Sequence, residues 1–249
     1  RRWVLLRGLM RDRRHWGDFP RLFAQHDPGA EVVTMDLPGN GALHRQPSPL
    51  RVEAVAGYVR AELARRGLAP PYHVLAMSLG AMVTVAWART WPRELAGAVL
   101  VNTSLRPFSP FHQRLRPRVY PTVLRMALAN PGAAASEAAI LRLTSNRPGA
   151  VEVLPQWTEW HRQLPVSTVN ALRQIAAAAR FHAPLTAPAV PLLLLNSAND
   201  GLVDPRCSRH LAQAWNCPIE VHPDAGHDLP LDDGEWVAQR VGEWLRRHH

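Results

Sequence analysis

The sequence predicts an α/β protein in which helices cover both faces of a doubly wound, mostly parallel sheet. Short apolar runs of strand length alternate with longer amphipathic or alanine-rich stretches of helical length at both ends of the chain. A chain of 249 residues is also long enough to bury one sizeable core. We therefore expect one α/β unit that carries a helical insertion.

The alternation of strands and helices divides the chain into a core and a cap. Strands are predicted at residues 3–6, 32–37, 72–77, 96–101 and 190–196, with a weaker candidate at 219–222. Helices are predicted at residues 52–66, 79–90, 205–215 and 234–247. From residue 105 to residue 189 the sequence contains prolines and alanine-rich helical pieces and no convincing strand. We expect residues 1–104 and 190–249 to form the α/β core and residues 105–189 to form a helical cap.

Composition and charge argue against a membrane partner and against a nucleic-acid partner. No apolar run approaches the ~20 residues that a transmembrane helix needs, and the first residues lack a signal-peptide pattern. We therefore expect a cytoplasmic protein without a membrane partner. The formal charge is +9, and all 29 basic residues are arginines scattered along the chain without an interleaved aromatic pattern, so no nucleic-acid partner is expected. The chain is expected to be a monomer or a homodimer.

The two cysteines, Cys207 and Cys217, have no accompanying histidines or cysteines at zinc-ligand spacing. Two free thiols and no metal site are the expectation.

Ser78 lies where an apolar strand leads directly into an apolar helix. A tight strand-to-helix turn exposes a serine hydroxyl above the carboxyl edge of the sheet, and small residues on either side, here Ala76 and Gly80, allow close packing. Free N–H groups at the start of the helix point toward an oxyanion formed beside the serine. The pattern favours a nucleophile, and the alternative is a structural N-cap serine.

A serine hydroxyl needs a base, and the base needs a partner that fixes its tautomer. Asp200 follows the fifth predicted strand and His227 follows the sixth. Because parallel strands end at one edge of the sheet, both loops are expected beside Ser78. Asp204 is the alternative acid, and Asp228 is expected to point elsewhere. The sequence thus predicts a serine hydrolase that forms an acyl-enzyme.

The chain resembles proteins of the α/β-hydrolase fold, especially small capped carboxylesterases related to the pimeloyl-carrier methyl ester esterase. The resemblance rests on the serine segment and on four further stretches. These are residues 5–16, which resemble the first-strand loop that starts with His-Gly and ends in tryptophan, residues 36–41, which resemble Asp-x-x-Gly-x-Gly, and the acid and histidine motifs at 200–203 and 226–227. The resemblance implies an oxyanion hole made by the backbone N–H groups of Leu9 and Leu79, and no cofactor.

Two residues depart from that family's pattern. Ala76 replaces the first glycine of Gly-x-Ser-x-Gly, and Arg7 stands where histidine is usual. We expect Arg7 either to brace the oxyanion loop through a carboxylate such as Asp12 or Asp36, or to contact an acidic substrate.

Substrate preference is expected to lie in the cap. The candidate substrate-binding residues are Met10, Met77, Phe108, Phe111, Trp157 and Trp160. The four aromatic residues either line an apolar acyl pocket or form the core of the cap, and the two methionines add apolar walls. The expected substrates are small-molecule carboxylic esters with a small to medium acyl chain.

Other functions stay open at this point because one triad serves many acyl compounds. They are hydrolysis of lactones, thioesters or carrier-linked esters, and a ligand receptor of the same fold with little turnover. Arginines of the cap leave open the docking of an acidic carrier protein. These arginines are Arg106, Arg114, Arg116, Arg118 and Arg125.

Overall fold

The computed structural model describes residues 1–129 and 131–248. It contains one six-stranded sheet of order β2-β1-β3-β4-β5-β6, in which every neighbouring pair is parallel. The strands are β1 (Arg2–Leu6), β2 (Glu31–Met35), β3 (Tyr72–Met77), β4 (Leu95–Val101), β5 (Leu192–Ser197) and β6 (Ile219–His222). The predicted fold class is confirmed, and all six predicted strands are present with small shifts at their ends.

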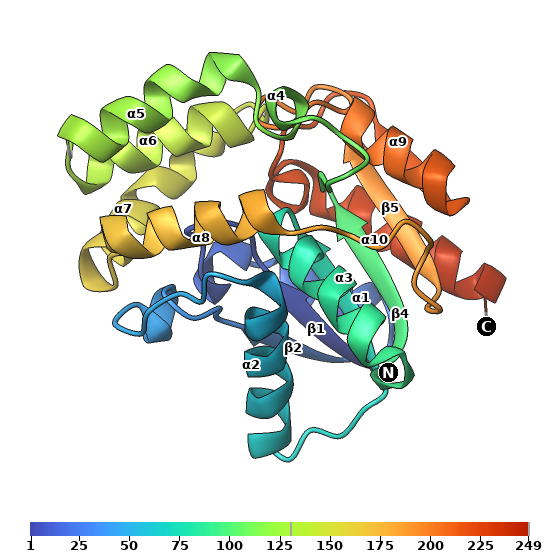
Figure 1. The fold of residues 1–249 in the computed structure, drawn as a ribbon. Coiled ribbons are helices and arrows are strands. Elements are labelled where there is room, and N and C mark those ends of the chain that lie inside the picture. Colours follow the sequence, from blue (N-terminus) through green and yellow to red (C-terminus); the bar gives the residue numbers. More distant parts are fainter. Residues whose placement is uncertain (130, 249) are drawn as a thin grey trace.

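Helices cover both faces of the sheet (Figure 1). The core helices are α1 (Phe19–His26), α2 (Val52–Arg65), α3 (Leu79–Thr90), α9 (Arg206–Trp215) and α10 (Leu229–His248). Val4 and Leu6 of β1 belong to a buried cluster with α2 and α3, whereas Trp3 and Leu5 belong to a second cluster with α1 and α10. Because successive strand residues point to opposite faces, the two clusters are the two sides of a doubly wound sheet.

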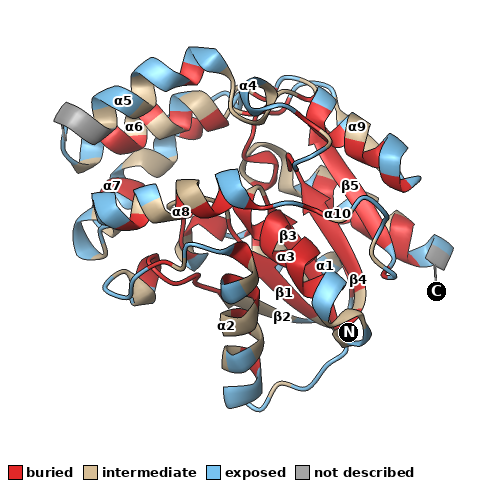
Figure 2. Cartoon of the chain, in the orientation of Figure 1, coloured by how far each residue is buried: buried red, intermediate tan, exposed pale blue. Residues whose placement is uncertain are grey.

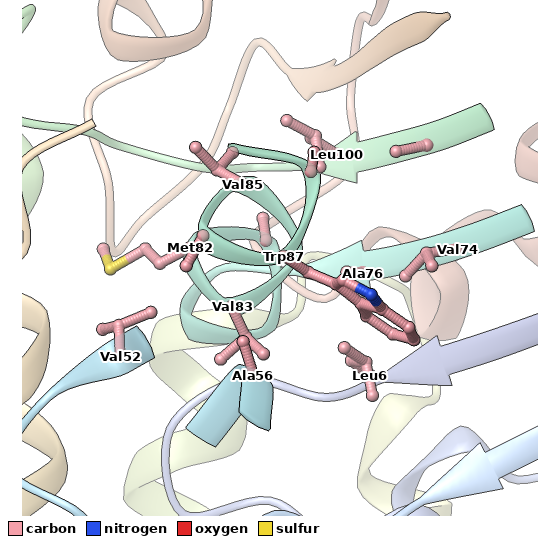
Figure 3. Packing of buried hydrophobic residues seen from close by; sticks show 14 of the residues in the cluster. Leu6, Val52, Ala56, Val74, Ala76, Met82, Val83, Val85, Trp87 and Leu100 are labelled. Carbon is pink, nitrogen blue, oxygen red and sulfur yellow. The ribbon is translucent and has the colours of Figure 1, made fainter. Parts of the chain in front are cut away.

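Helix α3 is the most deeply buried helix of the core, as its colour in Figure 2 shows. Every residue from Leu79 to Ala88 is buried, which explains why this segment is apolar all round. Figure 3 shows Trp87 reaching over Val74 and Ala76 of β3. Because α3 packs so closely against the sheet, its first residues and the turn that precedes them are held in a fixed position.

Between β4 and β5 the described residues form helices and turns, with no strand of the sheet. The helices are α4 (Phe111–Arg114), α5 (Tyr120–Ala129), α6 (Ala133–Thr144), α7 (Leu154–Gln163) and α8 (Thr168–Arg180). An isolated β-bridge joins Arg106 to His182 near the two ends of this region. The helices α5, α6, α7 and α8 lie together beside the core (Figure 1). The division at 104/105 and 189/190 stays a prediction.

None of the helices in the described residues combines the length and the apolarity that crossing a membrane requires.

Candidate active site

Ser78 occupies the turn between β3 and α3 with φ 51° and ψ −113°. A non-glycine residue in this region of backbone space is strained and persists only where the surrounding structure enforces it. Here the Ser78 N–H donates to the carbonyl oxygen of Val101 at 3.0 Å, which ties the turn to β4. Ser78 is half-buried while Met77 and Leu79 on either side are buried, so the turn lifts the serine out of the core.

Two glycines let the loop after β1 pack directly against this turn. A Cβ atom at Gly80 would lie 2.6 Å from the carbonyl oxygen of Leu6 and 2.7 Å from that of Arg7. A Cβ atom at Gly8 would lie 3.1 Å from the Ser78 Cβ. The loop after β1 and the start of α3 are therefore in backbone contact, which only glycine at position 80 permits.

His227 and Asp200 form a buried hydrogen-bonded pair. The His227 Nδ1 lies 2.7 Å from the Asp200 Oδ2, and the two residues are 5% and 1% exposed. The other oxygen, Oδ1, accepts from the N–H groups of Leu202 and Val203 at 2.8 and 2.9 Å. Both oxygens of the Asp200 carboxylate are therefore hydrogen-bonded. Because the carboxylate binds Nδ1 of His227, the other ring nitrogen, Nε2, remains for other partners. His227 and Ser78 line the same cavity of about 130 Å³.

Asp204, the alternative acid, is engaged elsewhere. It accepts from Nε and Nη2 of Arg206 at 3.1 and 2.8 Å. These hydrogen bonds, which outweigh the opposing effect of burial, lower the pKa of Asp204 to about 2. Asp200 is the acid that contacts the histidine.

Asn102 holds the histidine loop in place. It is 1% exposed, it directly follows β4, and its Nδ2 donates to the carbonyl oxygen of His227 at 2.8 Å and to Oγ of Ser197 at 2.9 Å. Its Oδ1 accepts from the Ser197 N–H at 2.8 Å. Asn102 is not among the residues predicted from the sequence, although a polar residue directly after an apolar strand was an available signal.

Comparisons with known proteins show the family of the chain. A model described as the alpha/beta hydrolase family matches residues 3–240. The chain belongs to this family. A search of curated proteins gave no match. The closer likeness to esterases related to the methyl ester esterase stays a prediction.

Solved structures similar to this alpha/beta hydrolase share its fold along nearly the whole chain. A thermophilic esterase from Thermogutta terrifontis, solved with malate bound, is 26% identical with a TM-score of 0.73, over 100% of this chain and 90% of that chain. The enol-lactonase from Burkholderia xenovorans LB400 is 20% identical with a TM-score of 0.75, over 98% and 91%. A hydrolase from Pseudomonas aeruginosa PA01 is 18% identical with a TM-score of 0.78, over 98% and 89%.

The two oxyanion donors expected for this alpha/beta hydrolase lie beside Ser78. Leu79 is the first residue of α3, and Leu9 lines the cavity that contains Ser78. Within residues 1–129 and 131–248, neither backbone N–H takes part in a hydrogen bond. The next residue of the loop differs, because the Met10 N–H donates to Oε1 of Gln174 at 2.9 Å.

Arg7 forms a buried ion pair with a carboxylate, as in the structural alternative, but the carboxylate is that of Asp228 and not of Asp12 or Asp36, the two examples given for it. Its Nη1 and Nη2 lie 3.1 and 2.5 Å from the two carboxylate oxygens of Asp228, and the guanidinium lies 4.9 Å from the centre of the Trp16 ring. Asp12 instead caps the following turn, and Asp36 accepts two backbone N–H groups. Burial raises the pKa of Asp228, but the Arg7 cation outweighs burial and lowers it.

Two adjoining cavities extend from Ser78 into the helical region. The first, which we call the inner chamber, is the cavity of about 130 Å³ that contains Ser78 and His227. The second, the cap chamber, measures about 160 Å³ and is enclosed by residues of α5, α6, α7 and α8. The residues common to both walls are Met10, Arg11, Val123, Met126, Ile140 and Ile175.

The predicted substrate-binding residues are only partly at these chambers. Met10 and Met77 line the inner chamber, and Trp160 lines the cap chamber. Trp157 is 2% exposed and packs in a cluster of the helical region, as in the alternative of a cap core. Phe108 and Phe111 line neither chamber. Phe108 packs edge-on against Trp215, and Phe111 is 74% exposed.

Charged residues gather at one end of the cap chamber. Arg11 Nη1 lies 2.6 Å from Oε2 of Glu137, and His161 Nδ1 lies 2.8 Å from Oε1. Burial raises the pKa of Glu137, but the Arg11 charge and the bond to His161 outweigh it and lower the pKa to about 2. Burial, and then the Arg11 charge, lower the pKa of His15 to about 4. At neutral pH the wall of the chamber therefore contains the Arg11–Glu137 ion pair, the charged Asp12 that pairs with Arg14, and a neutral His15.

Outside the two chambers, the described residues offer a cavity and two thiols but no metal cluster. Among the described residues, no three His, Cys, Asp or Glu side chains gather to hold a metal ion. Cys207 and Cys217 are free thiols, as expected. A cavity of about 530 Å³ lies beside α2, where Arg60 and Glu94 pair with each other, and it contains none of the predicted triad.

Proposed function

We propose that this alpha/beta hydrolase is a serine esterase in which Ser78 is the nucleophile, His227 the base and Asp200 the group that orients the base. The observation that carries the proposal is the buried Asp200–His227 hydrogen bond, with His227 lining the same cavity as a strained serine. This combination matches the division of roles in a Ser-His-Asp triad.

In the proposed reaction, Nε2 of His227 takes the proton of Ser78 as Oγ attacks the ester carbonyl. The negative charge that develops on the carbonyl oxygen is stabilised by the N–H groups of Leu9 and Leu79. The alcohol departs with the proton from His227 and leaves an acyl-enzyme. Water then repeats the cycle, releasing the acid and restoring Ser78.

The proposed substrates are small-molecule esters with a small to medium acyl chain. The inner chamber is narrow, and most of its side chains are aliphatic or methionine, which suits an alkyl chain. Three of the cap arginines donate to carbonyl oxygens of this chain, which favours a structural use over docking of an acidic carrier. These are Arg106 to Ala179, Arg114 to Ala178 and Arg118 to Gly201.

The first test is turnover of p-nitrophenyl esters from acetate to decanoate by the parent, Ser78→Ala and Ser104→Ala. Ser104 is a matched control because it is buried and lines neither chamber. We expect many turnovers and one fluorophosphonate adduct, measured by intact mass, in the parent and in Ser104→Ala. Ser78→Ala should lose the adduct and at least about 10³-fold in kcat.

Two outcomes would contradict parts of the proposal. An adduct without turnover of any simple ester would leave the triad standing and redirect the search to lactones, thioesters, carrier-linked esters or a receptor role. A parent that forms no adduct and turns over no ester would show that Ser78 is not an activated nucleophile.

A further inference from the structure

The loop that carries Leu9 is held in place by a helix of the cap region. Met10, the next residue, has a φ of 55°, a conformation that L-residues seldom adopt. Its N–H donates to Oε1 of Gln174 in α8 at 2.9 Å. Gln174 is 4% exposed and is far from the loop in sequence, so this contact has no local cause.

Side-chain amides continue from this bond and return to the same loop. Nε2 of Gln174 donates to Oδ1 of Asn40 at 2.7 Å, and Nδ2 of Asn40 donates to the carbonyl oxygen of Arg11 at 3.0 Å. Because a backbone N–H can only donate and a carbonyl can only accept, the orientation of both amides is fixed. Gln174 and Asn40 thus close a ring of hydrogen bonds that holds the Met10 N–H at one side and the Arg11 carbonyl oxygen at the other.

The loop N–H groups near Ser78 differ in whether they already have a partner. The Met10 N–H donates to Gln174, whereas the Leu9 N–H makes no hydrogen bond within the described residues and Leu9 lines the cavity beside Ser78. An oxyanion donor works only when its direction is set before the charge develops. A loop with a strained residue next to that donor needs an external partner to keep the direction fixed.

We propose that Gln174 is a positioning residue of the oxyanion hole, through which α8 sets the direction of the Leu9 N–H. The proposal rests on the proposed function, since it requires an oxyanion to form beside Ser78. Gln174 itself touches no reacting atom. Its removal lowers the rate of acyl transfer more than it weakens binding of the ester.

Asn170 provides a matched control one helical turn earlier in α8. It is 5% exposed, donates to the carbonyl oxygens of His44 and Gln46, and accepts from the Ser48 N–H. Its side chain fastens α8 to the loop after β2 with three hydrogen bonds. Gln174 makes two hydrogen bonds to that loop and one to the N–H of Met10, whereas within the described residues Asn170 makes none to the loop after β1. Comparing variants of Asn170 and Gln174 therefore distinguishes the effect of loosening α8 from the effect of losing control over the Leu9 N–H.

The test compares the full-length parent with Gln174→Met, Gln174→Glu and Asn170→Leu on p-nitrophenyl butyrate. We expect Gln174→Met to lower kcat about ten- to a hundredfold with KM within about twofold. The affinity for benzeneboronic acid, whose tetrahedral adduct presents an oxygen to the hole, should fall in parallel. Asn170→Leu should keep kcat within about twofold, although its thermal midpoint should fall by about as much as that of Gln174→Met.

Gln174→Glu keeps the test decisive if the methionine variant folds poorly. A glutamate oxygen still accepts from the Met10 N–H but cannot donate to Asn40, so kcat should lie between those of the parent and Gln174→Met. Equal kcat in the parent and Gln174→Met, or equal losses in Gln174→Met and Asn170→Leu, would overturn the proposal while the esterase stands. A parent without turnover or adduct would overturn both.

Discussion

Two arginines at opposite ends of the loop after β1 are buried in similar surroundings. Arg7 and Arg11 are 3% and 7% exposed, each pairs with a carboxylate, and each guanidinium lies over a tryptophan ring. They differ in where the carboxylate comes from. Arg7 pairs with Asp228, next to His227, whereas Arg11 pairs with Glu137 of α6 in the cap region.

We call the two ion pairs the Arg7 joint and the Arg11 joint, and they differ in the titratable groups that surround them. The Arg7 pair is bidentate and links the oxyanion loop to the histidine loop. The Arg11 pair has one short bond, and two histidines adjoin it, His15 on Arg11 and His161 on Glu137. We therefore expect the Arg11 joint to respond to acid through Glu137 and His15, whose pKa values are lowered to about 2 and about 4.

The largest effect is expected from breaking the Arg7 joint. Arg7→Met leaves Asp228 buried and unpaired, which should lower the free energy of unfolding by about 3–5 kcal/mol. In the double variant Arg7→Met/Asp228→Leu neither charge remains, so most of that loss should be recovered. Urea denaturation at pH 7 of the parent, the two single variants and the double variant measures the coupling. Equal stability of Arg7→Met and the double variant would show that the pair is not a joint.

A smaller loss is expected from the Arg11 joint. Glu137→Gln keeps an acceptor for Arg11 but loses the charge, which should cost about 1–3 kcal/mol at pH 7. The folded pKa of Glu137 is lowered from 4.5 to about 2, so its stabilisation is present above pH 4.5 and is lost as the pH falls toward 2. Urea denaturation from pH 6 to pH 2 should show this acid loss in the parent and less of it in Glu137→Gln.

Glu159→Gln is the control for that measurement. Glu159 lies on α7 with a side chain that is 55% exposed and a loose contact of 3.9 Å to Arg162, so its replacement should leave the acid loss unchanged. The same acid loss in the Glu137→Gln variant as in the parent would contradict a role for Glu137 in the joint.

The smallest effect is expected at His15. Its folded pKa is lowered from 6.5 to about 4, so the unfolded chain binds a proton at a higher pH than the folded protein does. Stability from neutral His15 is therefore present above pH 6.5 and is lost as the pH falls toward 4. Between these values, the free energy of unfolding of His15→Gln should fall less than that of the parent, while the exposed control His112→Gln should match the parent.

The sequence was sufficient to predict the sheet and to place Ser78, Asp200 and His227 at one edge of it, because these signals are local. Apolar runs predict strands without knowledge of their neighbours, and the parallel order brings Ser78, Asp200 and His227 to one edge. The carboxylate that pairs with Arg7 was not identified because Asp228 is 221 positions away in the chain. Nothing near Arg7 indicates which carboxylate will face it.

The walls of the chambers were harder to predict because they depend on how each cap helix is rotated. Phe108 and Phe111 are large and apolar but point away from the chambers, whereas Val123 and Ile140 line both. Gln174 left a weak signal, since it is a polar residue on the alanine-rich buried face of α8. A hydrogen bond to a distant backbone N–H cannot be deduced from such a pattern.

The contact at Gly80 has a consequence for how new specificities arise in this protein. The carbonyl oxygens of Leu6 and Arg7 lie against the start of α3 at a separation that excludes any side chain, so main-chain atoms set the spacing between the Leu9 and Leu79 donors. A mutational scan should accept almost no substitution at position 80. In the proposed esterase, adaptation to other acyl groups would then proceed through the helices between β4 and β5, where exchanging a side chain reshapes a chamber and leaves Ser78, His227 and Asp200 in place.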